Sequence, residues 1–204
     1  MIRKRMLCIA AAVLTTVAYS QAYSMDMKKD SAHVMSDTVT LNGKLVTVAG
    51  PIPEVGKIAP DFELVNGEMN DVSLADFHTR YKIINIFPSV DTPVCGAALR
   101  RFNEMASKLN NTVVVSVSAD IPFAQRRFCA AENIDNVVTL SNFRSPSFGK
   151  AYGVAMTDGP LKGLNARAVV VLNPQNKVIY SERMQDVTKE PDYESILTLL
   201  QTQR

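Results

Sequence analysis

Cys95 is the residue of this chain best placed for chemistry. It ends the segment PSVDTPVC, residues 88–95, which directly follows the apolar run IINIF. The run predicts a buried strand, and Thr92 followed by Pro93 predicts the N-cap and first residue of a helix. Cys95 then lies in the first helical turn, where free backbone N–H groups and the helix dipole favour a thiolate. The spacing therefore predicts a nucleophilic cysteine. Two plainer roles stay open for Cys95: an inert buried thiol, or half of a stabilising disulfide.

The N-terminal 22 residues have the pattern of a secretory signal peptide. A basic start, MIRKR, precedes an apolar stretch over residues 6–18, and small residues follow up to a cleavage position near Ala22. The apolar stretch is shorter than the roughly 20 residues that span a bilayer comfortably. We therefore expect export to the periplasm or an equivalent compartment, with loss of Cys8. A retained membrane anchor is the alternative.

Cleavage changes both the net charge and the number of cysteines. It removes three of the 22 basic residues and none of the 20 acidic ones, so the net charge falls from +2 to about −1. Nothing in this charge balance indicates a nucleic-acid partner. Two cysteines remain, Cys95 and Cys129, and an even number in an exported protein predicts a disulfide.

The sequence offers few side chains that suit metal binding. The chain has only two histidines, His33 and His78, far apart in sequence, so we expect neither an ordinary zinc or iron site nor a Cys–His catalytic pair. We expect no cofactor. Residues 23–37 are polar and predict a flexible tether. Soft copper ligands are conceivable there, but nothing fixes their geometry: Met25, Met27, His33 and Met35.

After the tether, residues 38–204 predict one α/β domain. The segment TVTLNGKLVTV predicts a hairpin that turns at Asn42-Gly43. Further strands are predicted at 82–87, 112–118, 137–140, 166–172 and 177–181, and helices at 93–109, 122–132, 147–152 and 193–200. This alternation indicates a sandwich of helices on both faces of a mixed sheet.

The order of these elements and four motifs resemble the peroxiredoxins, specifically their thiol peroxidase subgroup of atypical two-cysteine enzymes. The motifs follow one another as GKIAPDFEL, PSVDTPVC, SADIPFAQRRFC and GPLKGLNARAVVVL. The second one matches the P-x-x-x-T-x-x-C signature of the family without a gap. The resemblance implies a thioredoxin-like three-layer sandwich with a mixed central sheet and an added N-terminal hairpin. It also implies a homodimer.

The resemblance assigns roles in an antioxidant oxidoreductase. Cys95 would be the peroxidatic cysteine, which attacks hydrogen peroxide or an organic hydroperoxide and becomes a sulfenic acid. Cys129 would be the resolving cysteine, which closes an intramolecular disulfide that a thioredoxin-like donor reduces. Thr92 and Arg167 would hold the thiolate and the peroxide oxygens, and Pro88 would shield the site from water. Arginine suits this role because it offers fixed donors without losing its proton.

Three of these assignments carry a further expectation or an alternative. Arg167 lies within the apolar run 164–171, which argues against the alternative of a surface salt bridge. Thr92 could act as a helix cap alone, and the cap and catalytic roles are compatible. We place Cys129 on a different helix from Cys95, and a disulfide needs Cα atoms within about 7 Å. We therefore expect disulfide formation to require local unwinding near one of the two cysteines.

Two other classes of protein compete with this interpretation. A thioredoxin-type oxidoreductase usually carries C-x-x-C, which this chain lacks. A binding or structural protein with a stabilising 95–129 disulfide explains the cysteine count but not Arg167. Such a disulfide would resist mild reductants, whereas a catalytic one would cycle.

Export leaves the electron donor and the preferred peroxide open. Thioredoxin is the donor that the resemblance implies, and outside the cytoplasm an exported thioredoxin-like protein would replace it. The sequence does not rank hydrogen peroxide against larger hydroperoxides. Phe87, Phe123 and Phe128 either line an apolar approach or belong to the core. We expect no stable membrane insertion after signal cleavage.

Overall fold

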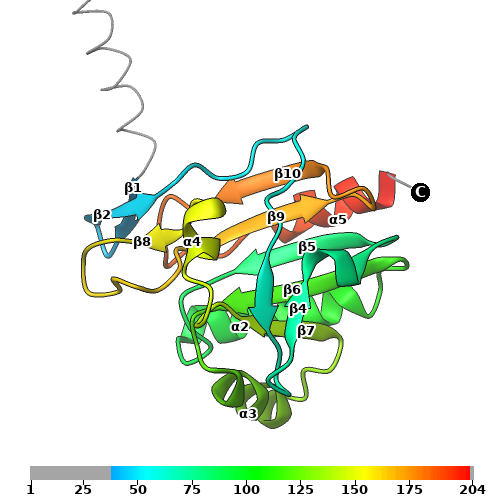
Figure 1. Cartoon of the computed structure of the whole chain (residues 1–204), viewed down its shortest axis with the longest axis horizontal. Coiled ribbons are helices and arrows are strands. Elements are labelled where there is room, and N and C mark those ends of the chain that lie inside the picture. The colour runs from blue at the N-terminus through cyan, green and yellow to red at the C-terminus, as the bar shows by residue number, and fades with distance from the viewer. Residues whose placement is uncertain (1–37, 203–204) are drawn as a thin grey trace, which may run out of the picture. The chain divides into compact units, whose positions relative to one another are not determined.

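The computed structural model describes residues 38–202 and contains two β-sheets. The expectations for the signal peptide and the tether, residues 1–37, lie outside the described residues. The larger sheet has seven strands in the order β10-β9-β5-β6-β7-β3-β4, and the smaller one has three strands in the order β1-β2-β8 (Figure 1).

The seven-stranded sheet is mixed. Its central strands β5 (Tyr81–Ile86), β6 (Thr112–Ser118) and β7 (Val137–Ser141) run parallel to one another. Antiparallel strands flank them: β9 (Ala168–Leu172) and β10 (Val178–Arg183) beyond β5, and β3 (Glu63–Val65) and β4 (Asp71–Ser73) beyond β7. The continuous apolar runs predicted for the central strands follow from burial on both faces of the sheet.

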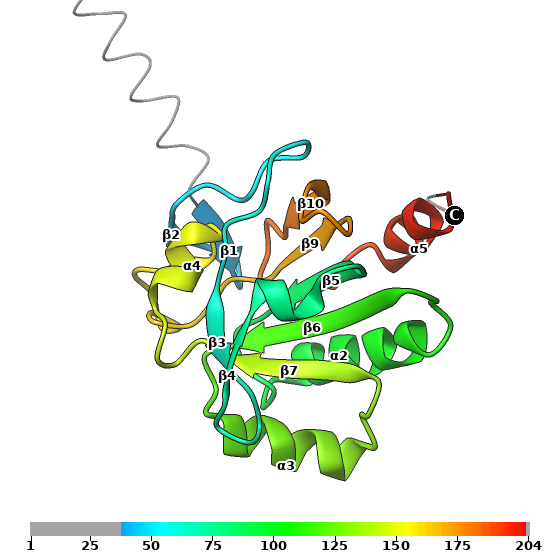
Figure 2. The same ribbon diagram turned by 45° about the vertical axis from the view of Figure 1, so that its right-hand side comes forward.

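Helices cover both faces of this sheet, and successive residues of a strand point alternately into the cores on its two sides. Ile83 packs in a cluster with Phe102 of α2 (Pro93–Ala106) and Ile196 of α5 (Tyr193–Thr202). Ile84 belongs to the opposite cluster, which includes residues of the short helices η1 (Leu74–Phe77) and α4 (Ser147–Ala151). The two layers of helices are visible in Figure 2. The predicted thioredoxin-like sandwich is thus confirmed. Within residues 38–202, no helix is both long and apolar enough to cross a bilayer.

The N-terminal hairpin forms as predicted. Strands β1 (Thr38–Leu41) and β2 (Lys44–Ala49) pair antiparallel, with Leu41 opposite Lys44. The two turn residues have positive φ angles, 52° at Asn42 and 76° at Gly43, which asparagine and glycine adopt most easily. The hairpin does not join the large sheet but pairs with β8 (Ala155–Met156), a strand that the sequence did not reveal.

Several boundaries differ from the prediction. The helix predicted to reach residue 109 ends at Ala106, because the chain tightens into turns in which Lys108 and Leu109 bond to carbonyls three residues back. Strand β9 begins at Ala168, since the N–H of Ala166 is already bonded to Val154 outside the large sheet. The elements β4 and η1 were not predicted.

Candidate active site

The sheet topology brings Cys95 and Arg167 to the same edge. Strands β5, β6 and β7 are parallel, so the segments that follow them emerge at one edge, where ligands of open α/β sheets usually bind. Strand β9 runs antiparallel to β5, and Ala168 pairs with Ile86. The start of β9 therefore lies beside the end of β5, where residues 88–95 begin.

Cys95 and Arg167 form a buried pair at this edge. Both residues are 1% exposed, and Nη2 of Arg167 lies 3.2 Å from Sγ of Cys95. Nε of Arg167 donates to the carbonyl oxygen of Val187 at 3.2 Å, which fixes the plane of the guanidinium. The contact places a charged N–H donor against the sulfur in a buried site, where such hydrogen bonds are strong.

The second terminal nitrogen of Arg167 has no protein acceptor. Nη1 is buried and lacks a hydrogen-bond partner among the residues that the structure describes. Buried donors are nearly always satisfied in native proteins, so an unused donor beside a nucleophile indicates a place for an atom from a ligand. An incoming oxygen that carries or develops negative charge fits this donor.

Thr92 begins α2 as predicted, but its side chain does not cap the helix. Its backbone is extended (φ −101°, ψ 139°), as an N-cap requires, and its carbonyl accepts the N–H of Gly96 at 3.0 Å. The hydroxyl donates instead to the carbonyl of Ser89 at 3.2 Å. The hydroxyl therefore links Thr92 to Ser89 within the loop. Pro88, also predicted as a site residue, is buried in the same loop.

Asp120 organises this loop, and it is not among the site residues predicted from the sequence. One carboxylate oxygen accepts the hydroxyl of Ser89 at 2.7 Å, and the other accepts the N–H of Val90 and the hydroxyl of Ser118, both at 2.8 Å. The signal that could have found it is its position two residues after the end of a parallel strand, at the edge of the sheet where the site lies.

Cys129 lies on α3 (Pro122–Glu132) and is half-buried. Burial raises the pKa of its thiol above the usual value, and a side-chain hydrogen bond with Thr139 offsets this only in part. Cys129 and Cys95 are both free, and both contact one apolar cluster that includes Leu99 and Ile134.

The three phenylalanines named from the sequence have different surroundings. Phe87 is fully buried in the core, and Phe123 is 51% exposed. Phe128 lines a hollow of about 280 Å³ over the start of α2, together with residues 90–93, Gly96 and Arg100. Of the three, only Phe128 borders an approach to the first turn of α2.

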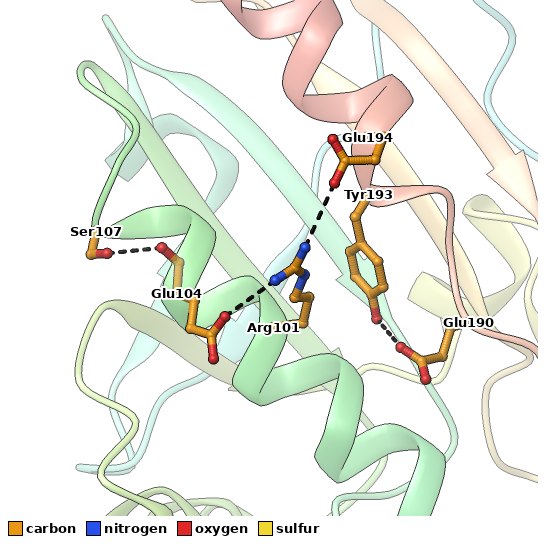
Figure 3. A network of polar contacts seen from close by, with 6 residues as sticks. All are labelled: Arg101, Glu104, Ser107, Glu190, Tyr193 and Glu194. Atoms are coloured by element: carbon orange, nitrogen blue, oxygen red, sulfur yellow. Dashed lines mark hydrogen bonds and ion pairs between the residues drawn. The ribbon is translucent and has the colours of Figure 1, made fainter.

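Helix α2 also contacts α5, which packs on the same face of the sheet. Arg101 of α2 lies between Glu104 at 3.3 Å and Glu194 at 3.6 Å, and its guanidinium is 5.9 Å from the ring centre of Tyr193 (Figure 3). The hydroxyl of Tyr193 donates to Glu190 at 2.8 Å. These groups are largely exposed, so each ion pair adds little stability. None of them contacts Cys95.

No group of three His, Cys, Asp or Glu side chains in residues 38–202 is arranged to hold a metal ion.

Comparisons with known proteins give the family. The model of the Redoxin family matches residues 54–197. The thiol peroxidase of Corynebacterium glutamicum is 46% identical over 158 residues, which cover 78% of this chain and 95% of that protein. Among solved structures, a peroxiredoxin-like protein from Aquifex aeolicus superposes with a TM-score of 0.77 at 37% identity, covering 81% of this chain and 96% of that one.

A thiol peroxidase from Chromobacterium violaceum superposes with a TM-score of 0.76 at 28% identity, over the same shares of the two chains. The Redoxin match spans more than half of this chain, and the similarity to the Corynebacterium protein extends over nearly all of that relative. The chain therefore belongs to the Redoxin family, among the thiol peroxidases of the peroxiredoxin type, and is a thiol-dependent peroxidase.

Proposed function

We propose that Cys95 is the peroxidatic cysteine of this peroxidase. Its thiolate attacks the terminal oxygen of a hydroperoxide, the O–O bond breaks, and the remaining oxygen leaves with a proton as water or an alcohol. The sulfur becomes a sulfenic acid. The observation that carries the proposal is the 3.2 Å contact between Arg167 and Cys95 in a buried site.

Arg167, Thr92 and Pro88 support this step. The unpartnered Nη1 of Arg167 is the donor that can follow the negative charge as it develops on the departing oxygen. Thr92 lines the hollow over the start of α2, and we assign its hydroxyl a hydrogen bond to the peroxide oxygens once its bond to Ser89 breaks. Pro88 is buried in the loop, and we assign it the role of excluding water from the site.

We assign Cys129 as the resolving cysteine. Its thiol attacks the sulfenic sulfur of Cys95, a disulfide forms, and water leaves. Both cysteines lie on fully wound helices, Cys95 in the first turn of α2 and Cys129 near the end of α3. Disulfide formation therefore requires local unwinding of α2 or α3. A thioredoxin-like donor then reduces the disulfide.

Export and a homodimer belong to the same proposal. The signal-peptide pattern of residues 1–22 supports export, to the periplasm or an equivalent compartment, where the reductant would be an exported thioredoxin-like protein. The resemblance to the family supports the homodimer. Fractionation of cells that express the full chain tests the first, and sedimentation of the purified protein tests the second.

Peroxide turnover with a thioredoxin system as the reductant tests the catalytic roles. The protein starting at Tyr23 is compared with its Cys95→Ser and Cys129→Ser variants. We expect turnover by the wild type, none by Cys95→Ser, and a sulfenic acid that fails to cycle in Cys129→Ser. Thiols of the wild type that ignore peroxide would refute the assignment of the two cysteines.

A further inference from the structure

Phe128 lies against the first turn of α2. A Cβ atom added to Gly96 would be 3.1 Å from Cζ and 3.5 Å from Cε2 of the Phe128 ring. The ring therefore contacts the helix backbone next to Cys95, and glycine is what allows this close approach. The same ring packs against the apolar cluster that contains Cys95 and Leu99.

Cys129, the next residue along α3, packs against the same apolar cluster but also borders a hollow on the side of β7. It lines a second hollow of about 290 Å³ with residues 66–68 and Thr139, and the first turn of α2 is not part of that lining. Phe128 thus occupies the contact between α3 and α2 while the thiol of Cys129 is held on the side of β7.

The polar contacts that link α2 to α3 and to the residues after it are peripheral. Arg100 and Glu132 form an ion pair at 2.8 Å, but their side chains are 48% and 36% exposed, so the pair adds little. Asn103 accepts the N–H groups of Asp135 and Asn136, which lie beyond the end of α3. The apolar contact of Phe128 is the one next to the reacting cysteine.

We propose that Phe128 is a positioning residue that holds α3 against α2 and so sets the rate at which Cys129 reaches oxidised Cys95. This inference rests on the proposed function. The sulfenic acid of Cys95 has two fates: it condenses with the Cys129 thiol and releases water, or it attacks a second peroxide, whose O–O bond breaks to give a sulfinic acid and an alcohol or water. Phe128 thereby sets what fraction of the sulfenic acid becomes a disulfide and what fraction becomes a sulfinic acid.

Removal of the ring weakens the contact, so α3 detaches more often and the disulfide forms faster. Phe128→Ala removes the ring, and Gly96→Ala displaces it with an added methyl group while Phe128 stays in place. Phe128→Leu keeps part of the apolar contact and should lie between wild type and Phe128→Ala. Phe123→Ala is the matched control, because Phe123 is on the same helix and 51% exposed.

The experiment is single-turnover stopped-flow with hydrogen peroxide, which resolves formation of the sulfenic acid from formation of the disulfide. Mass spectrometry then measures the sulfinic fraction at high peroxide. In Phe128→Ala we expect the first step to stay within about twofold of wild type, the second to be at least about fivefold faster, and the sulfinic fraction to fall by a similar factor. Gly96→Ala should shift the second step in the same direction, and Phe123→Ala should match wild type.

The outcomes distinguish a failure of this inference from a failure of the proposed function on which it rests. A normal first step with an unchanged or slower second step in Phe128→Ala overturns the role of Phe128 alone. A slower first step with an unchanged second step also overturns it, and shows that the ring shapes peroxide access. A wild-type protein that forms no sulfenic acid overturns the proposed function itself. A purely structural role would lower the melting temperature of Phe128→Ala without changing the sulfinic fraction.

Discussion

Replacement of Arg167 by methionine should slow the oxidation of Cys95 far more than it perturbs the fold. Arg167 is 1% exposed and donates to Sγ of Cys95 at 3.2 Å. A hydrogen bond to a charged group contributes about 1.5–3 kcal/mol. At about 1.4 kcal/mol for each factor of ten, its loss lowers the rate constant roughly 10- to 150-fold.

Arg167→Lys tests whether charge alone is enough. A lysine ammonium is a point charge and cannot donate to Val187, to the sulfur and to an incoming oxygen with the fixed geometry of a guanidinium. We therefore expect Arg167→Lys to remain at least about tenfold slower than wild type. The measurement is the second-order rate constant for Cys95 oxidation by hydrogen peroxide, followed in a single turnover.

Arg101→Met is the matched control, because Arg101 lies on α2 with its side chain 47% exposed and paired with Glu104 and Glu194 (Figure 3). It should retain the rate constant of the wild type. Arg167→Met also leaves the carbonyl of Val187 without this donor, at a cost in unfolding free energy of about 1–3 kcal/mol, so the fold of each variant is checked by circular dichroism. A folded Arg167→Met variant within threefold of the wild-type rate would refute the reasoning.

Three further results are expected. Asp120→Asn leaves donors of the active-site loop without their carboxylate, so urea denaturation should show a loss of about 1–3 kcal/mol, and an unchanged midpoint would contradict this. Because burial raises the pKa of Cys129, its alkylation by iodoacetamide in Cys95→Ser should keep rising up to pH 9, and a plateau near pH 8 would be the contrary result. Hydrogen bonds from Ser195 hold the pKa of Asp192 below its usual value. The carboxylate thus stabilises the fold above about pH 4 and ceases to do so as the pH falls through the lowered pKa, so Ser195→Ala should destabilise the protein at pH 6 but not near pH 2.

The elements with strong local signals were predictable from the sequence. Asn42-Gly43 fixed the hairpin turn, and the continuous apolar run of β6 identified its strand with the observed bounds, 112–118. Helix α3 also has its predicted bounds, because Pro122 suits a first helical position and Asn133 ends the helix with a positive φ of 54°.

Long-range pairing was not predictable in the same way. Nothing local to Arg167 indicates that it lies beside Cys95, since that depends on the antiparallel pairing of β9 with β5. The contact between Phe128 and Gly96 depends on how α3 packs on α2, and glycine in a helix carries no signal for its partner. Short pieces such as β8, with two residues, have too few positions to show a period.

The buried charge of Arg167 helps to decide between a catalytic and a permanent disulfide. Among the residues described, no carboxylate lies within ion-pair distance of Arg167, and its acceptors are the Val187 carbonyl and the Cys95 sulfur. A buried cation without a counter-charge is costly, and the sulfur of Cys95 is the acceptor that carries a negative charge in the proposed mechanism. A permanent bond to Cys129 would remove that charge and leave the guanidinium uncompensated. A disulfide that forms only while the site is open, and is then reduced, avoids this cost.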